Sequence, residues 1–342
     1  MADYGFLGNI LVIVVALVFL NWTSNIVINY ATKVAALGKL GKTSVGFTLI
    51  SLATTLPELT VALSAALSGG APLSIGNALG SNIFNITVIL GLGAILLGLK
   101  LNFGKNQNKT SASSCNIIPS FVQSEFSNIE FGLFVSSLVP LVLIYTSTQA
   151  AWLVGLLLLV IFAGYMYRLS KVKVTTEETD IEVEPQERGS LKKYILFTVL
   201  GALGVVISAN FLVESAIFIA TSMGVSQQVI GATIIAAGTS LPELTISIKS
   251  ILRGHPNLAL GNIVGASFFN TTLILGIALF VPALVGAPLT FNMNVFLNLI
   301  IFAMVANVFF SHFLSRRQLT WKEGTVFLII YALFLIATLG LI

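Results

Sequence analysis

The sequence predicts an all-α membrane protein, with ten transmembrane helices arranged as two inverted five-helix repeats. Only 9% of its 342 residues are charged, 56% are hydrophobic, and the mean hydropathy is +0.98. Soluble domains carry about 25% charged residues, and so few charges could not cover the surface of a soluble protein. Apolar stretches long enough to cross a bilayer recur along the chain, and two segments are copies of each other. A soluble enzyme is therefore excluded.

Each predicted span is an apolar run without period-two alternation. The lipid interior admits only helices and closed barrels, so each run is expected to be a helix. Only Asp3 carries a charge before the first run, so we expect that run to be a retained span rather than a cleaved signal peptide. The predicted spans are 6–32, 44–68, 73–98, 129–147, 150–168, 194–221, 226–249, 257–286, 291–313 and 323–341.

The basic residues indicate the orientation of the chain in the cell membrane. All 17 Lys and Arg residues fall in the loops after the first, third, fifth, seventh and ninth spans. By the positive-inside rule these loops are cytoplasmic, and both termini lie outside. The polar segment 171–193 is then a cytoplasmic linker between a first repeat, 1–170, and a second repeat, 194–342. The single cysteine, Cys115, excludes an internal disulfide.

An internal repeat gives the strongest indication of function. SLATTLPELT matches AAGTSLPELT, and GNALGSNIFNITVILG matches GNIVGASFFNTTLILG; the copies cover 51–60, 236–245, 76–91 and 261–276. Glu58 and Glu243 lie 185 residues apart, as do Asn85 and Asn270. With five spans per half, the second copy enters the membrane from the opposite side. Inverted repeats of this kind are typical of secondary transporters that bind substrate at the bilayer midplane.

Glu58 and Glu243 lie at matching central positions of predicted spans. A carboxylate at the bilayer centre costs about 2.5–3.5 kcal/mol on insertion scales and needs a compensating partner. These spans hold no Lys, Arg or His near the glutamates, which leaves a metal ion or a proton. Pro57 and Pro242 precede the glutamates in mid-helix. Each removes a backbone donor and frees carbonyl groups, which are suitable ligands for a hard cation.

Further oxygens fall on the same helix faces as the glutamates. They come from Ser51, Thr54, Thr55, Asn77, Ser81 and Asn85 in the first copy, and from Thr239, Ser240, Asn262 and Asn270 in the second. Ca2+ takes six to eight oxygen ligands, whereas zinc, copper and nickel prefer imidazole or thiolate. One divalent cation or two monovalent cations would neutralise the two glutamates. Alternating occupancy of the site by such ions would exchange one kind of cation for the other.

The paired TTLPE and GTSLPE motifs, each followed by a G-N-x-x-G-[SA]-x-x-F-N segment, resemble the repeats of the calcium/cation antiporter superfamily. The resemblance is closest to the prokaryotic sodium/calcium exchangers. The ion-binding motifs would cover 44–91 and 229–276. The resemblance implies exchange of cytosolic Ca2+ for external Na+ without ATP or a cofactor, so the protein is not expected to be an enzyme. It also implies gating by movement of the first and sixth spans against the other eight.

Carried over position by position, the resemblance makes Glu58 and Glu243 the shared ligands of Ca2+ and Na+. Hydroxyl, amide and backbone oxygens would complete the site, from Thr54, Thr239, Thr55, Ser240, Ser81, Asn85, Ser51 and Ala236. Asn270 stands where some relatives have Asp, and Ala266 where they have Ser. The pair of glutamates is intact, but the Na+ stoichiometry cannot be carried over.

Several alternatives remain open at this stage. A Ca2+/H+ antiporter of the same fold would protonate the two glutamates alternately. An ion channel is disfavoured by the broken-helix repeat, and an intramembrane enzyme by the lack of a His-Glu metal cluster or a Ser-Lys dyad. The expected partners are Ca2+, Na+ and the lipid bilayer, with no nucleic acid. The oligomeric state is left open, with a monomer as the working expectation.

Two sets of polar residues have competing interpretations. Asn21, Asn25 and Asn29 form a stripe on the first span, echoed by Asn210 and Glu214 on the sixth. They could line the ion pathway or bond neighbouring helices, with Glu214 expected near the outer rim. Asn77 and Asn262 could line the site or only cap and cross-link helices.

Overall fold

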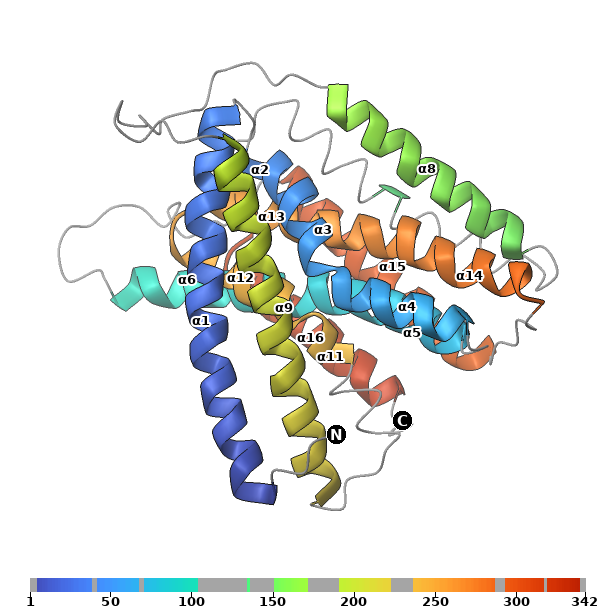
Figure 1. Ribbon diagram of the computed structural model, residues 1–342, viewed down its shortest axis with the longest axis horizontal. Coiled ribbons are helices and arrows are strands. Elements are labelled where there is room, and N and C mark those ends of the chain that lie inside the picture. The colour runs from blue at the N-terminus through green and yellow to red at the C-terminus, as the bar shows by residue number, and fades with distance from the viewer. Residues whose placement is uncertain are drawn as a thin grey trace.

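The structure of the protein is a computed structural model. It describes residues 5–38, 42–67, 71–103, 134–135, 151–171, 191–222, 236–286, 293–316 and 319–338. Within these ranges every regular element is a helix, which agrees with the predicted all-α class. The elements are packed into one assembly of crossing helices (Figure 1).

Six of the described helical stretches are long and apolar enough to cross a membrane. They are Gly5–Val34, Ser74–Lys100, Leu191–Ser208, Pro256–Leu284, Leu297–Ser315 and Trp321–Thr338, with a shorter apolar helix at Ala151–Tyr167. Most of the predicted span 129–147 and part of 226–249 lie outside the described residues. The protein is thus a helical, multi-pass membrane protein, and the count of ten spans stays a prediction.

The two longest helices, α1 (Gly5–Gly38) and α9 (Leu191–Ser222), run side by side (Figure 1). Glycines permit their close approach: a Cβ at Gly204 would lie 2.6 Å from Thr23, and one at Gly201 would lie 3.0 Å from Val27. The rings of Tyr30 and Phe197 stack with their centroids 4.9 Å apart. These contacts bind α1 and α9 into one pair.

Both spans that carry a Pro-Glu pair are broken where the sequence predicts. In the first copy the chain runs through α2 (Lys42–Val45), the π-helical segment η1 (Gly46–Ile50), α3 (Ser51–Thr54) and α4 (Leu56–Leu67). In the second, α11 (Ala236–Thr239) is followed by α12 (Leu241–Leu252). Thr55 (φ −81°, ψ 7°) and Ser240 (φ −91°, ψ 8°) leave the helical region at matching positions. Pro57 and Pro242, two residues further on, lack the N–H that would continue each helix.

The spans that follow each break share a second irregularity. α5 (Ala71–Phe84) continues through η2 (Asn85–Ile89) into α6 (Leu90–Phe103). Its counterpart runs from α13 (Pro256–Phe269) through η6 (Asn270–Ile274) into α14 (Leu275–Leu284). Both five-residue π segments begin at the repeated asparagine. Single π turns inside α-helices occur often at functional sites, and the sequence pattern did not predict these.

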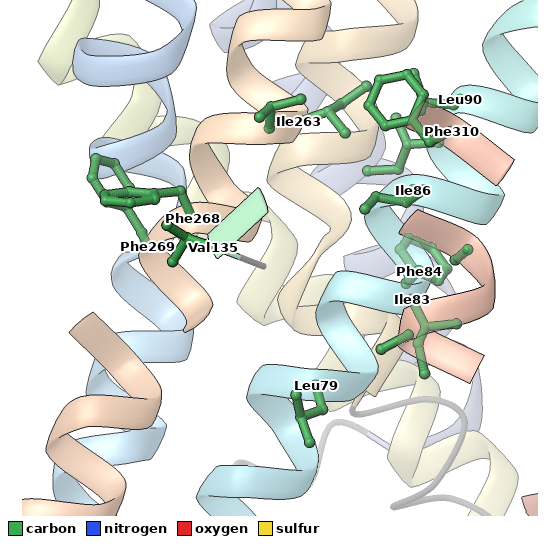
Figure 2. Close-up of a cluster of buried hydrophobic side chains, with 14 of the residues drawn as sticks. Leu79, Ile83, Phe84, Ile86, Leu90, Val135, Ile263, Phe268, Phe269 and Phe310 are labelled. Atoms are coloured by element: carbon green, nitrogen blue, oxygen red, sulfur yellow. The ribbon is translucent and has the colours of Figure 1, made fainter. Parts of the chain in front are cut away.

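The remaining helices enclose these central spans. α8 (Ala151–Lys171) packs on α14, where a Cβ at Gly155 would lie 2.9 Å from the Gly276 carbonyl oxygen. α16 (Trp321–Thr338) packs on α6, and α15 (Met293–Ser315) on α5. A large hydrophobic cluster fills the space between them, and Figure 2 shows part of it, including Ile83, Leu90 and Phe310. Of the six apolar stretches, those that contain η2 and η6 are the most buried, so polar groups on them lie away from lipid.

Candidate cation site

The two predicted glutamates lie in the first turns of α4 and α12, directly after the helix breaks. Both side chains are fully buried. The breaks place them between α5 and α13, and α12 packs against α13 as α4 packs against α5. A helix N-terminus stabilises negative charge, but only by about 0.3–1 kcal/mol in exposed settings. That is less than the cost of a carboxylate at membrane depth, so a further partner is needed.

Glu58 receives hydroxyl groups from both copies of the repeat. Ser81 Oγ and Ser240 Oγ each lie 3.5 Å from Glu58 Oε1. The two hydroxyl oxygens are themselves 2.5 Å apart. Ser81 comes from α5 and Ser240 from the second break, so residues 159 positions apart in sequence meet at one carboxyl group. This cluster presents several oxygens to a small volume.

Glu243 has a different environment. Neither of its carboxyl oxygens has a hydrogen-bond partner within the described part of the chain. The hydroxyl of Thr54 lies beside it, as Thr239 lies beside Glu58. A buried carboxylate without donors is strongly unfavourable unless a cation or a proton compensates it. Glu58 Oε2 also lacks a partner among the described residues, so the two glutamates differ in the hydroxyl groups that lie 3.5 Å from Glu58 Oε1.

The central threonines make matching contacts across the repeat. Thr54 Oγ1 lies 3.5 Å from Asn262 Oδ1 and 3.2 Å from the Ser51 carbonyl oxygen, and Thr239 Oγ1 donates to Asn77 Oδ1 over 3.2 Å. Thr54 and Thr239 are equivalent positions of the repeat, 185 residues apart, and so are Asn77 and Asn262. A hydroxyl that donates its proton to an amide oxygen keeps its lone pairs free for a cation. Asn77 and Asn262 thus cross-link the helices and contact the central threonines, and lining of the site by these amides stays a prediction.

The other predicted ligands are also buried nearby. Asn85 and Asn270 are fully buried at the starts of η2 and η6, and neither amide group has a partner among the described residues. The backbone carbonyl of Ser51 accepts from Thr55 N at 2.9 Å and from Thr55 Oγ1 at 2.9 Å. Ala236 begins α11 at the equivalent place. Ala266 is buried on α13 and offers no hydroxyl.

One cross-link near the site was not predicted. Asn82 Nδ2 donates to Thr271 Oγ1 over 2.8 Å, and both side chains are buried. It joins α5 to η6 immediately beside the repeated asparagines. Asn82 directly follows Ser81, and Thr271 directly follows Asn270. Neither residue belongs to the i,i+4 stripe from which the ligands were predicted. The sequence signal for this bond is a polar residue directly after each of the ligands Ser81 and Asn270.

The asparagine stripe of α1 lies apart from the glutamates. Its residues bond to the C-terminal end of α12, where Arg253 Nη1 donates to Asn29 Oδ1 over 3.0 Å. The interpretation of the stripe as helix-to-helix bonding is therefore supported. Glu214 is exposed on α9. Among the described residues, no three His, Cys, Asp or Glu side chains lie together as a metal-binding group. The site is accordingly a pair of carboxylates surrounded by hydroxyl, amide and carbonyl oxygens.

Buried carboxyl groups at broken helices are typical of membrane proteins that transport cations. Residues 8–171 and 193–340 match the family model described as "Sodium/calcium exchanger protein". Because this match covers most of the chain, the protein belongs to the sodium/calcium exchanger family, whose members are membrane cation antiporters.

Similar proteins agree with this assignment. The sodium/calcium exchanger MaX1 of Methanosarcina acetivorans is 28% identical over 96% of this chain and 97% of its own length. The putative antiporter CaxA of Alkalimonas amylolytica is 29% identical over 80% of this chain and 82% of its own. Among solved structures, the sodium-calcium exchanger NCX_Mj soaked with 10 mM Na+ and no Ca2+ has a TM-score of 0.75 at 23% identity. That alignment covers 96% of this chain and 98% of the other, and it establishes the common fold.

Proposed function

We propose that the protein exchanges Ca2+ for Na+ across the cell membrane by alternating access, with the ions bound between Glu58 and Glu243. The observation that carries the proposal is the pair of fully buried carboxyl groups at repeat-related helix breaks, one of them without a hydrogen-bond donor. One Ca2+ or two Na+ ions would neutralise this pair. Competition for the same charges couples the two fluxes in opposite directions, provided that the site changes sides only when bound ions neutralise it.

The proposed ligands are the residues that surround these carboxyl groups. Besides the two glutamates they are Thr54, Thr239, Thr55, Ser240, Ser81, Asn85, Asn270, and the backbone carbonyls of Ser51 and Ala236. Burial of the described side chains in this set other than half-buried Thr239, and the contacts of both threonines with amide groups, support the assignment. Hard cations such as Ca2+ and Na+ prefer oxygen ligands of this kind.

The proposed topology has ten spans in two inverted halves, 1–170 and 194–342, joined by a cytoplasmic linker at 171–193, with both termini outside. The matching helix breaks, π segments and threonine–asparagine bonds support a twofold relation between the halves. In this topology the α1–α9 pair moves against the remaining helices to expose the site to each side in turn. The close contacts between α1 and α9 at Gly201, Gly204 and the Tyr30–Phe197 ring pair support movement of the two helices as one body.

The unequal surroundings of the glutamates suggest a division of roles. The hydroxyl groups of Ser81 and Ser240 beside Glu58 would serve as Na+ ligands. In the other copy the position of Ser81 is taken by Ala266, and that of Ser240 by Thr55, whose hydroxyl donates to the Ser51 carbonyl oxygen. A Ca2+/H+ antiporter is the second candidate, because the Glu243 carboxyl group without donors would also be compensated by a proton. The hydroxyl groups at Glu58 favour Na+ coupling.

Transport by purified protein in vesicles separates the two functions. Ca2+ uptake is measured with Na+, K+ and pH gradients imposed one at a time. The proposal predicts uptake driven by an outward Na+ gradient and no uptake driven by a pH gradient in the absence of Na+. Uptake driven by the pH gradient alone would establish the proton antiporter and contradict Na+ coupling.

A further inference from the structure

Lys249, in the last turn of α12, is half-buried against α1 and surrounded there by oxygens. Its ammonium group lies 2.7 Å from the Asn21 carbonyl oxygen, 2.5 Å from Asn21 Oδ1, 2.7 Å from Ser24 Oγ and 3.2 Å from Asn25 Oδ1. One turn further on, Arg253 Nη1 donates to Asn29 Oδ1 over 3.0 Å. Two cations spaced i,i+4 thus match the asparagine stripe spaced i,i+4.

One of the acceptors on α1, the Ser24 hydroxyl, is held in position by a bond within its own helix. Ser24 Oγ donates its own proton to the Leu20 carbonyl oxygen over 2.7 Å, which leaves its lone pairs for Lys249. An ammonium group has three donors, so the four oxygens satisfy it completely. Hydrogen bonds to charged groups are roughly twice as strong as neutral ones. The contact therefore fixes the position of α1 along α12.

This contact joins two separately stabilised bodies. α1 is attached to α9 through Gly201, Gly204 and the stacked rings of Tyr30 and Phe197. α12 is attached to the central helices through two other bonds, since Asn262 Nδ2 donates to Ser247 Oγ over 3.0 Å and Lys100 Nζ donates to the Leu252 carbonyl oxygen over 2.5 Å. Other packing between the two bodies is largely an apolar cluster that includes Val27, Ile28 and Ile246. Apolar surfaces can slide, whereas directed hydrogen bonds select one position.

The contact lies on one side of the cation site. Lys249 follows Glu243 by six residues on the same helix, or about 9 Å at 1.5 Å per residue. In the proposed topology this is the cytoplasmic side. A positive charge between the site and the cytoplasm also opposes the passage of another cation along this route.

The other copy of the repeat has no such cations. The positions 185 residues before Lys249 and Arg253 are Ser64 and Ser68, and those after Asn25 and Asn29 are Asn210 and Glu214. Asn210 and Glu214 are exposed on α9. If both sides closed with the same contacts, the two halves would give the inward-facing and outward-facing states equal stability. The basic pair is therefore an asymmetry that acts on the equilibrium between them.

We infer that Lys249 and Arg253 form an inner latch, which closes the cytoplasmic route and makes the outward-facing state the resting state. The inference rests on the proposed alternating access and adds residues that touch no transported ion. They are positioning residues: they act on the movement of α1 and leave the ligands unchanged. Only differential stabilisation of two states can shift their populations, and these bonds exist only while α1 lies against α12.

The test compares the apparent Ca2+ affinity at the two faces of the membrane in the Lys249→Met variant. Methionine keeps an unbranched side chain of similar length and removes the charge. The concentrations of Ca2+ that half-saturate transport are measured from the cytoplasmic face and from the external face in vesicles of opposite orientation. Because apparent affinity falls with the fraction of competent state, the ratio of cytoplasmic to external values should fall by roughly tenfold or more. Lys249→Arg should keep the wild-type ratio.

Two further variants make the result specific. Lys100→Met removes another lysine at the same end of α12 but within the central helices, and should leave the ratio unchanged. Asn25→Ala keeps Lys249 and removes one acceptor, and should shift the ratio in the same direction by a smaller factor. This variant also serves if Lys249→Met does not fold. A purely structural defect would reduce transport from both faces equally, and an unchanged ratio in both Lys249→Met and Asn25→Ala would overturn the latch.

A second readout does not depend on which ions are carried. In a Cys115→Ser background, a probe is introduced by Asn210→Cys and labelled from outside with an impermeant thiol reagent. Lys249→Met or Asn25→Ala should slow this labelling as the outer side closes more often, and an unchanged rate would contradict the latch. Failure of the wild type to exchange Ca2+ would instead contradict the proposed function.

Discussion

The charge of the cation site comes from two residues, but the structure makes them unequal. Glu58 has hydroxyl groups from Ser81 and Ser240 at 3.5 Å, while Glu243 has no hydrogen-bond partner among the described residues. A hydroxyl adds an oxygen ligand for a monovalent ion without adding charge. The hydroxyl groups beside Glu58 are therefore expected to affect the affinity for Na+. Both glutamates are needed to neutralise a divalent ion.

Removing the Ser81 hydroxyl should weaken Na+ more than Ca2+. We expect Ser81→Ala to raise the Na+ concentration that half-inhibits Ca2+ binding by roughly fivefold, equivalent to ~1 kcal/mol for one hydrogen-bonding group. Ala266→Ser should lower it, because it supplies the missing hydroxyl beside Glu243. Ser74→Ala removes another buried hydroxyl from α5 and is the control. Equal effects of Ser81→Ala and Ser74→Ala on Na+ would contradict a specific role.

At the scale of elements, the breaks before α4 and α12 and the π segments η2 and η6 bring ligands from four helices together. Close backbone contact holds them there. A Cβ at Gly265 on α13 would lie 2.5 Å from both the Phe47 carbonyl oxygen and Ser51 Oγ, and one at Gly46 would clash with the Leu258 carbonyl oxygen. Only glycine allows η1 and α3 to approach α13 so closely.

Gly265→Ala should therefore destabilise the central helices. The added methyl group must displace backbone as well as a side chain, so we expect a loss of about 1–3 kcal/mol. The measurement is the thermal midpoint of unfolding in detergent. Gly164→Ala is the matched control on α8, since a Cβ there meets no described atom within 4 Å. A midpoint for Gly265→Ala equal to that of the control would show that the contact does not limit packing.

The positions of the helix breaks and of the two glutamates could be predicted from sequence, because proline and intramembrane carboxylates act locally. The π segments could not, since Asn85 and Asn270 fit a regular helix pattern equally well. The bond between Ser81 and Ser240 depends on how two distant helices cross. Lys249 illustrates the same limit: its charge indicated a cytoplasmic loop, but the structure places it in α12 with its ammonium group on α1.

At the scale of the whole molecule, α1 and α9 form one pair beside the central helices (Figure 1). The apolar cluster between them and the central helices permits relative movement, and the bonds of Lys249 and Arg253 favour one position. Such an arrangement separates the ligands, which determine the ions carried, from the residues that determine which side is open. A substitution in the ligands should leave the balance between the inward-facing and outward-facing states measurable, and a substitution in the latch residues should leave ion selectivity measurable.

The central claim is that Ca2+ and Na+ compete for one site formed by Glu58 and Glu243. Its most direct test is equilibrium binding of radioactive Ca2+ to the purified protein, titrated with Na+. We expect one Ca2+ per chain, displaced by Na+ with a Hill coefficient above one because two positive charges must be replaced. Glu58→Gln and Glu243→Gln should each abolish binding, while Glu177→Gln in the polar linker should not. Full Ca2+ binding by either site variant, or binding that Na+ does not displace, would contradict the account.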